Sequence, residues 1–237
     1  MPVLDTILFD MGGTLDGRGA WRGRSRQLFL DLGLDQFSDK EHRTAFDYAE
    51  SQAHKEGHLA HARLRDMLRS HIGWQLEALG VRNEQFAREW VDRFAAGAEH
   101  AAAANRVMLA TLRDRGFRLG IVSNACGNVA TLCDEFAYTP SLSAIVDSYW
   151  FGSTKPDPAI FRHALELLGA SAERTGFVGD SVDRDIRPAK QLAMTTFWIP
   201  DPGAAPEAAA DIVLDNVADL PDCLLALERS EPARSDR

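Results

Sequence analysis

The stretch Ile7-Leu8-Phe9-Asp10-Met11-Gly12-Gly13-Thr14-Leu15-Asp16 decides the fold of this chain. Its apolar start, followed by the Gly12-Gly13 pair, is typical of a buried strand that breaks into a tight turn. Asp10 is therefore predicted to lie at the carboxyl end of a strand, where open α/β sheets bind their ligands. A strand-end aspartate can also simply cap a turn, so the other polar segments of the chain must decide between the two interpretations.

Two further apolar segments also end in polar side chains. Residues 119–122 are followed by Ser123 and Asn124, and residues 176–179 release Asp180, with Asp185 in the following turn. A serine hydroxyl at a strand end can donate to an anion, and clustered carboxylates suit Mg²⁺, which prefers hard oxygen ligands. These segments alternate with helical patterns, which predicts a parallel α/β sheet with right-handed crossovers.

A fourth polar segment, residues 152–158, carries Lys155 in a region otherwise poor in lysine. Pro156 and Pro158 restrict the backbone beside it, so the ammonium can be aimed at a site. Singly, each of the four motifs also fits a turn or a helix N-cap. Their joint order along the chain, Asp, Ser, Lys and then Asp with Asp, favours a catalytic centre.

This order and spacing resemble the haloacid dehalogenase superfamily, whose members are mostly Mg²⁺-dependent phosphatases with an aspartate nucleophile. The resemblance covers nearly the whole chain. It implies a Rossmann-like core with an inserted α-helical cap, and an aspartyl-phosphate intermediate formed from a small phosphorylated metabolite. A carboxylate that attacks a phosphate dianion is repelled by it, so such a site needs a divalent cation and a lysine.

The resemblance also implies a role for each motif residue of this sequence. Asp10 would be the nucleophile, Thr14 would hydrogen-bond within the loop and help to orient it, and Lys155 would be the charge partner of nucleophile and phosphate. The phosphate site would comprise Ser123, Asn124, Lys155, Gly12 and Gly13. The Mg²⁺ ligands would be Asp10, the backbone carbonyl of Gly12, Asp180 and Asp185, although Asp183 competes with Asp185 for a place near the metal.

Gly12 is the departure from the family pattern, in which phosphatases carry a second aspartate at this position that protonates the leaving group and later activates water. General acid-base assistance contributes about 10²- to 10⁴-fold, or roughly 3 to 5 kcal/mol, when the leaving group is a poor one. We therefore expect weak activity on ordinary phosphomonoesters. The loss should matter less for acyl phosphates, phosphoanhydrides or halides, whose leaving groups are weak bases.

Four explanations for this departure are open. A histidine of the cap could reach in, because His54, His58 and His61 lie at helical spacing, although they also fit a solvated helix face. Asp16 could take the role, although it also fits a turn. The substrate could supply its own acid or need none. Finally, the chain could be a catalytically silent protein that binds a phosphate ligand or regulates a partner on the same fold.

The non-phosphatase branches of the superfamily are a further alternative. The phosphonate-cleaving branch uses a cap lysine, for which only Lys40 and Lys55 are candidates, and their surroundings do not resemble that branch. The dehalogenase branch uses no metal, and the acidic Asp180 to Asp185 cluster argues against it.

Between the first two motifs, residues 17–100 carry apolar residues at helical spacing, which predicts the cap. Residues 1–16 and 101–228 are predicted to form the core, with residues 101–105 as the return linker or the start of a helix, and 229–237 a disordered tail. Trp21, Trp74 and Trp90 could line a pocket under the cap, but such aromatics are more often core. The cluster Arg18, Arg22, Arg24 and Arg26 could meet an anionic substrate or lie on a solvated helix.

The composition fits a cored enzyme of 237 residues, 45% of them hydrophobic, with a net charge of −9. The basic residues are scattered, so we expect no nucleic-acid partner. We also expect no membrane association, because no apolar stretch approaches the length of a membrane span. Three cysteines without a paired framework suggest a reducing cytoplasm. Monomer and homodimer remain open.

Overall fold

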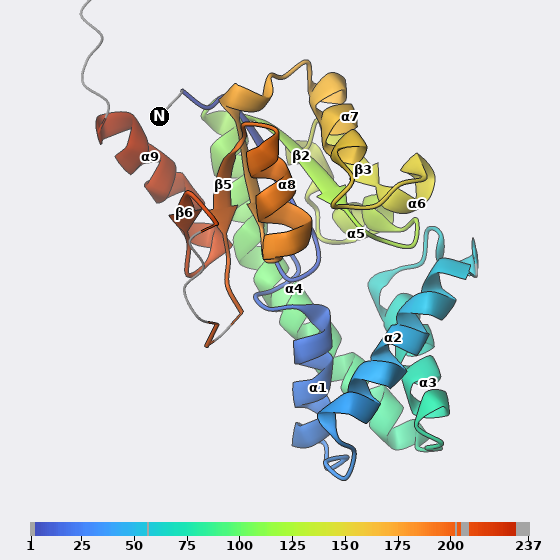
Figure 1. Ribbon diagram of the computed structural model, residues 1–237. Coiled ribbons are helices and arrows are strands. Elements are labelled where there is room, and N and C mark those ends of the chain that lie inside the picture. Colours follow the sequence, from blue (N-terminus) through green and yellow to red (C-terminus); the bar gives the residue numbers. More distant parts are fainter. Residues whose placement is uncertain (1–2, 56, 202, 205–208, 231–237) are drawn as a thin grey trace, which may run out of the picture.

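The computed structural model describes residues 3–55, 57–201, 203–204 and 209–230. Within them, the strands form one parallel sheet in the order β3-β2-β1-β4-β5-β6 (Figure 1). The strands are Thr6–Phe9 (β1), Arg118–Ser123 (β2), Ala144–Asp147 (β3), Thr175–Gly179 (β4), Thr195–Trp198 (β5) and Ile212–Val213 (β6). The strand order reverses at β1, and such a switch point opens a crevice at the carboxyl ends of the strands. The predicted parallel α/β fold is confirmed.

The sheet is buried on both faces because successive side chains of each strand point to opposite sides. Ile7 and Phe9 of β1 belong to a large apolar cluster that continues into the long helix α4 (Glu84–Asp114), whereas Leu8 belongs to a second cluster with α7 (Pro158–Leu168). This packing holds β1 rigidly between two layers. The remaining core helices are α5 (Val129–Glu135), α6 (Ser148–Phe151), α8 (Arg187–Gln191) and α9 (Leu220–Ser230), with the short segments η2 (Thr139–Ser141), η3 (Ala172–Arg174), η4 (Val182–Ile186) and η5 (Val217–Asp219).

A helical insertion lies between β1 and β2, and Figure 1 shows it beyond the carboxyl edge of the sheet. It consists of α1 (Trp21–Asp31), α2 (Asp39–Lys55), η1 (Gly57–Leu59), α3 (Leu64–Ala78) and the N-terminal half of α4. α4 begins where the Asn83 side chain accepts a hydrogen bond from Phe86 N at 2.9 Å, and it ends just before Gly116, whose φ is +91°.

Several boundaries differ from the sequence-based expectation. β3 was not predicted, because its four residues carry too short an apolar signal. Residues 101–105 are not a linker but lie within α4, which crosses from the insertion to the core as one helix. The alanine run there has high helix propensity and no breaker interrupts it. Arg229 and Ser230, predicted to be disordered, belong to α9, and residues 231–237 lie outside the described part of the chain.

No helix among the described residues combines the length and the apolar character needed to cross a membrane.

Candidate functional site

Polar side chains from four segments meet at the carboxyl edge of the sheet, as expected. Phe9 is paired with Ile121 of β2 and with Val178 of β4, so the segments that follow these strands emerge side by side. Asp10 N donates to Val178 O at 2.8 Å, which extends the β1–β4 pairing by one residue and fixes the direction of the Asp10 side chain. Asp10 and Ser123 are buried at this edge.

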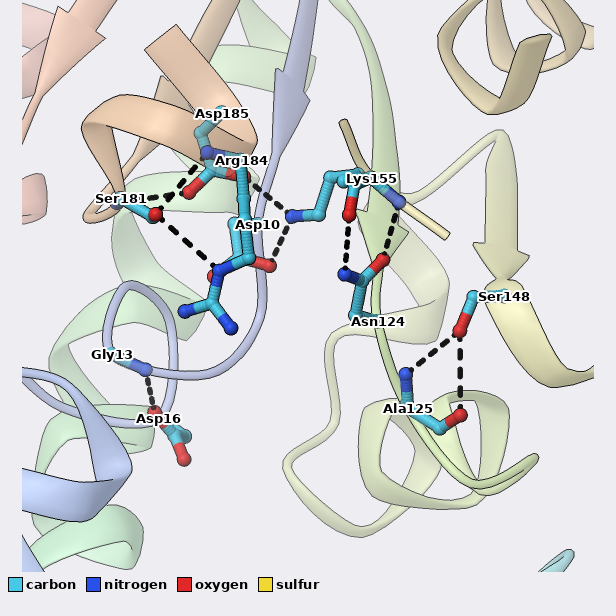
Figure 2. Close-up of polar contacts among 10 residues, drawn as sticks. All are labelled: Asp10, Gly13, Asp16, Asn124, Ala125, Ser148, Lys155, Ser181, Arg184 and Asp185. Atoms are coloured by element: carbon cyan, nitrogen blue, oxygen red, sulfur yellow. Dashed lines mark hydrogen bonds and ion pairs between the residues drawn. The ribbon is translucent and has the colours of Figure 1, made fainter. Parts of the chain in front are cut away.

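Lys155 is the electrostatic centre of the site (Figure 2). Its Nζ lies 2.6 Å from Asp10 Oδ1 and 2.6 Å from Asp185 Oδ1, and its side chain is 2% exposed. Burial alone lowers the pKa of Lys155, but the two carboxylates outweigh burial and raise it above its ordinary value. The ammonium therefore stays charged and is shared by two buried acids.

Asn124 shapes the lysine loop. Its Oδ1 accepts from Lys155 N at 2.7 Å, and its Nδ2 donates to Lys155 O at 2.9 Å, next to the cis peptide bond between Lys155 and Pro156. Both ends of the amide are thus engaged with the backbone of Lys155. The structure gives Asn124 this loop-clamping contact, while its predicted role in phosphate binding remains a proposal.

A cluster of carboxylates completes the site. Oxygen atoms of Asp10, Asp180 and Asp185 lie within 4.8 Å of one another. Burial raises the pKa of Asp180, and repulsion from the other two acids raises it further. Burial also raises the pKa of Asp10, although Lys155 opposes the increase. Asp10 and Asp185 share the Lys155 ammonium and Asp180 is not paired with it, so the cluster has more carboxyl groups than its ammonium can balance.

The cluster has one unsatisfied atom that is informative. Asp180 Oδ1 is buried and, within the described part of the chain, has no hydrogen-bond partner. A buried polar atom without a partner costs about 1 to 3 kcal/mol, more when it is charged. Converging hard oxygens with one orphaned ligand atom fit a divalent cation such as Mg²⁺.

Two glycines allow this close approach. A Cβ at Gly179 would lie 2.6 Å from Asp185 Cβ and Cγ, so Asp185 could not reach the cluster past a larger residue. Gly13 has φ +85°, and a Cβ there would lie 2.4 Å from Asp180 Oδ2. Gly13, the second glycine of the first motif, is therefore needed for the turn and for the proximity of Asp180.

The loop after Asp10 is held by Asp16. This buried carboxylate accepts from Gly13 N at 2.7 Å, from Arg24 Nη1 at 3.1 Å, and from Trp21 Nε1. Its hydrogen-bonding capacity is thus used by the loop and by the first turn of α1, which supports a structural role over a catalytic one. The indole of Trp21 lies beside Gly12, and a Cβ on Gly12 would be 3.4 Å from it.

A cavity of about 530 Å³ lies above the cluster, between the sheet edge and the helical insertion. Its core side includes Asp10, Ser123, Lys155, Asp180 and Arg184. Its other side is formed by residues of α1, α2 and α3, among them Trp21, Arg22, Phe46, Asp47, Glu50, His54 and His71.

The histidines, tryptophans and second aspartate that the sequence analysis named lie in different places. His54 borders the cavity, His61 stacks on Trp150 at a ring distance of 5.4 Å, and the side chain of His58 lies outside the described set. Trp21 lines the cavity whereas Trp90 is fully buried in the core. Asp183 is paired with Arg187 and is not in the carboxylate cluster, which contains Asp185.

The structure also places Thr14 and the four arginines of the sequence analysis. Thr14 Oγ1 is buried without a hydrogen-bond partner among the described residues, so its hydroxyl does not brace the loop; only its backbone N–H bonds to Met11 O, at 3.3 Å. The arginine cluster is dispersed. Arg18 bonds to Pro200 O, Arg24 to Asp16 and Arg26 to Asp39, and Arg22 alone of the four borders the cavity.

Sequence reasoning missed Arg184 and Glu50. Both line the cavity, Arg184 on the side of the core and Glu50 on the side of the helical insertion. The Arg184 guanidinium lowers the pKa of Asp10 and Asp180, and its backbone N donates to Ser181 Oγ at 3.2 Å (Figure 2). Arg184 could have been suspected from its place between two predicted metal ligands. Glu50 has no such signal, since it lies in a helix where acids are common on solvated faces.

Comparison with known proteins matches residues 4–192 to the family of haloacid dehalogenase-like hydrolases. A glyceraldehyde 3-phosphate phosphatase of Methanocaldococcus jannaschii is 34% identical over 94 residues, which are 38% of this chain and 40% of that protein. A phosphoserine phosphatase of Thermus thermophilus is 32% identical over 128 residues, 50% of this chain and 47% of that protein. The matched segments thus span less than half the length of these curated relatives.

A solved structure of a dehalogenase with an intermediate complex superposes with a TM-score of 0.65 at 16% identity, covering 94% of this chain and 98% of that one. At this identity the likeness extends to the fold alone.

Proposed function

The chain belongs to the family of haloacid dehalogenase-like hydrolases, and on that premise we propose that it is a Mg²⁺-dependent phosphohydrolase with Asp10 as its nucleophile. The observation that carries the proposal is the buried cluster in which Lys155 bridges Asp10 and Asp185 while Asp180 keeps an unpaired oxygen. The names of the sequence relatives support phosphate as the group transferred. The substrate is a small phosphorylated metabolite that fits the cavity.

Asp10 performs the first chemical step. One carboxylate oxygen of Asp10 attacks phosphorus, the bond from phosphorus to the leaving oxygen breaks, and an aspartyl phosphate forms. In the second step the oxygen of a water molecule attacks the same phosphorus, and the bond to Asp10 breaks to restore the carboxylate. Lys155 holds Asp10 in place and offsets the negative charge of the incoming phosphate, and Ser123 donates to a phosphate oxygen.

Asp10, Asp180, Asp185 and the carbonyl of Gly12 would hold the metal. The donor set is made only of oxygen atoms, and its excess negative charge and the orphaned Asp180 Oδ1 fit a divalent cation. When bound, Mg²⁺ supplies charge neutralisation between the nucleophile and the phosphate. We propose that the helical insertion acts as the cap that closes over this site and selects the substrate.

We expect the preferred substrates to be phosphate compounds whose leaving groups are weak bases. Gly12 offers no acid to protonate a departing alkoxide, and Asp16 is engaged by Gly13, Trp21 and Arg24. An acyl phosphate or a phosphoanhydride needs little protonation as it leaves. We therefore expect these classes to be hydrolysed about 10²-fold or more faster than sugar phosphomonoesters.

A panel of phosphate-release assays tests the proposal. Acetyl phosphate and pyrophosphate are compared with sugar phosphates, in Mg²⁺ and in EDTA, with Asp10→Asn as the blank. Turnover that requires Mg²⁺, favours the first two compounds and vanishes in the blank is the expected result. Asp180→Asn should lose Mg²⁺-dependent turnover, whereas the matched change Asp183→Asn, in an exposed residue outside the cluster, should keep it.

One observation favours a second candidate, a catalytically silent protein that binds a phosphate ligand. Position 12 has no carboxylate, and Trp21 packs beside it. This candidate predicts metal and phosphate binding without an aspartyl phosphate. Gly12→Asp distinguishes the two, because its Cβ would meet the indole at an ordinary contact distance of 3.4 Å. A large gain in monoesterase rate supports an otherwise intact enzyme, and no turnover on any substrate supports the silent protein.

A further inference from the structure

A chain of hydrogen-bonded polar side chains, buried except for Glu50 at its end, crosses the helical insertion and ends at the cavity. It runs from His42 on α2 through Ser25 on α1, then Gln75 and His71 on α3, to Glu50 on α2. Ser25 and Gln75 are fully buried, and His42 and His71 are each 2% exposed. Polar groups this deeply buried in a small helical unit are costly unless every one of them is paired.

The hydrogen bonds of this chain have one consistent direction. Ser25 Oγ donates to Gln75 Oε1 at 2.9 Å, which turns the amide nitrogen of Gln75 toward His71 Nδ1, also at 2.9 Å. An amide nitrogen can only donate, so His71 Nδ1 must accept and the ring proton lies on Nε2. His71 Nε2 then donates to Glu50 Oε1 at 2.9 Å. The network thus fixes the tautomer of His71 and aims one carboxylate into the cavity.

Glu50 lies on the wall of the cavity opposite the nucleophile. Asp10 belongs to the sheet edge and Glu50 to the helical insertion, and both line the same space. Arg184 lowers the pKa of Glu50 as well as that of Asp10, so the two carboxylates lie within electrostatic range of one guanidinium. Attack on a phosphate bound to Asp10 must come roughly in line from the side away from Asp10, so a base on the cavity wall formed by the insertion could take the proton of the attacking water.

We propose that Glu50 is the general base that activates water to hydrolyse the aspartyl phosphate, and that His71 and Gln75 are its positioning residues; this rests on the function proposed above. The water oxygen bonds to phosphorus while the bond from phosphorus to Asp10 breaks and returns its electron pair to the Asp10 carboxylate. The water proton passes to the Glu50 oxygen that His71 does not hold. Inorganic phosphate leaves, and Glu50 releases the proton to solvent.

The charge state of Glu50 suits a base. Burial raises its pKa, but the hydrogen bond that His71 donates and the positive charge of Arg184 are among the causes that outweigh burial and hold the pKa below its ordinary value. Glu50 is therefore a carboxylate at neutral pH, able to accept a proton from water but not to protonate a leaving group. This division agrees with an enzyme that lacks an acid for the first step and retains a base for the second.

Other cavity residues fit this role less well. Both ring nitrogens of His71 are engaged within the chain of hydrogen bonds. Asp47 is an exposed residue 4.0 Å from Arg22. His54 is exposed at the end of α2, and no side chain that the structure describes forms a hydrogen bond that would orient it. His54 is therefore the matched control.

Rapid quenching with ³²P-labelled acetyl phosphate tests the proposal in the full-length protein with Mg²⁺. In Glu50→Gln, the burst of enzyme phosphorylation should stay within about threefold of wild type, while steady-state turnover falls about 10²-fold or more. The labelled aspartyl phosphate should therefore accumulate. His54→Gln and Asp47→Asn should accumulate no more of it than wild type. His71→Gln should slow only the steady-state phase, because it disturbs the position of Glu50 and not Asp10.

The outcomes separate the two proposals. If wild type turns over through Asp10 but Glu50→Gln slows burst and turnover equally, Glu50 is not the base and only this inference is overturned. If no variant and no wild-type sample forms an aspartyl phosphate, both proposals fall. Glu50→Asp is a second test, because it keeps the carboxylate but shortens the side chain. Partial accumulation of the aspartyl phosphate in this variant supports the assignment. If circular dichroism shows that Glu50→Gln is misfolded, a wild-type turnover rate in Glu50→Asp contradicts the assignment.

Discussion

The sheet edge and the helical insertion differ in how completely their polar groups are paired. At the sheet edge, Asp10 and Asp185 share one lysine, and an oxygen of the neighbouring Asp180 has no partner among the described residues. In the insertion, every member of the chain from His42 to Glu50 has a hydrogen-bond partner. The first arrangement is charged and incomplete, so it calls for a ligand. The second is complete, so it can hold one carboxylate still.

The largest expected effect comes from removing the ammonium that Asp10 and Asp185 share. Lys155→Met leaves these two buried carboxylates without their cationic partner, which typically costs about 3 to 5 kcal/mol of unfolding free energy. Urea denaturation in EDTA measures this loss, and Mg²⁺ should recover part of it by taking over the charge. Lys190→Met is the control, because Lys190 is half-exposed with Asp211 and should cost no more than about 1 kcal/mol. Equal losses in the two variants would contradict the central role of Lys155.

The second largest effect should be a pH dependence of the unfolding free energy that comes from His42 in the helical insertion. Burial, with help from Arg26, lowers the pKa of His42 to about 4, so His42 is neutral in the folded insertion. The unfolded chain takes up its proton near pH 6.5, so the stability present above pH 6.5 is lost as pH falls toward 4, by up to about 3 kcal/mol. His42→Gln keeps a donor for Ser25 but cannot titrate, and it should flatten this dependence in unfolding curves between pH 7 and 5.

The sheet edge should respond to pH in the opposite direction. The pKa values of Asp10 and Asp180 are raised in the folded state, so without metal their contribution to stability falls as pH rises through their folded pKa values. Asp180→Asn in EDTA should therefore gain stability relative to wild type at pH 8 and gain little at pH 5. The same sign of response in both regions would remove the distinction drawn above.

The smallest effects come from two glycines, one in each region. Gly179→Ala puts a Cβ 2.6 Å from Asp185, so it should cost about 1 to 3 kcal/mol and weaken Mg²⁺ binding. Gly73→Ala lies in α3 with no atom within 4 Å of its Cβ, so it should stabilise by about 0.5 to 1 kcal/mol. Thermal unfolding and calorimetric Mg²⁺ titration of both variants measure these changes. A neutral Gly179→Ala would mean that Asp185 can move without loss.

The two regions also differ in what the sequence could reveal. The sheet-edge residues follow apolar strands directly, so Asp10, Ser123 and Asp180 could be placed by their neighbours in the chain. The insertion network joins three helices through pairs that are 17, 21 and 50 positions apart, and helical spacing alone does not say which faces meet. Asp16 looked like a possible acid until its three donors were located, and Asn124 turned toward the lysine loop. Contacts of this kind depend on tertiary packing, which no local pattern encodes.

The continuity of α4 limits how this protein can change in evolution. Thirty-one residues at 1.5 Å each form one rod of about 46 Å that belongs to both units of the molecule. A single inserted or deleted residue in its shared middle would turn the helical insertion by about 100° relative to the sheet and carry Glu50 away from Asp10. Length variation in this helix should therefore be tolerated only in whole turns, while the surface loops of the insertion can grow freely.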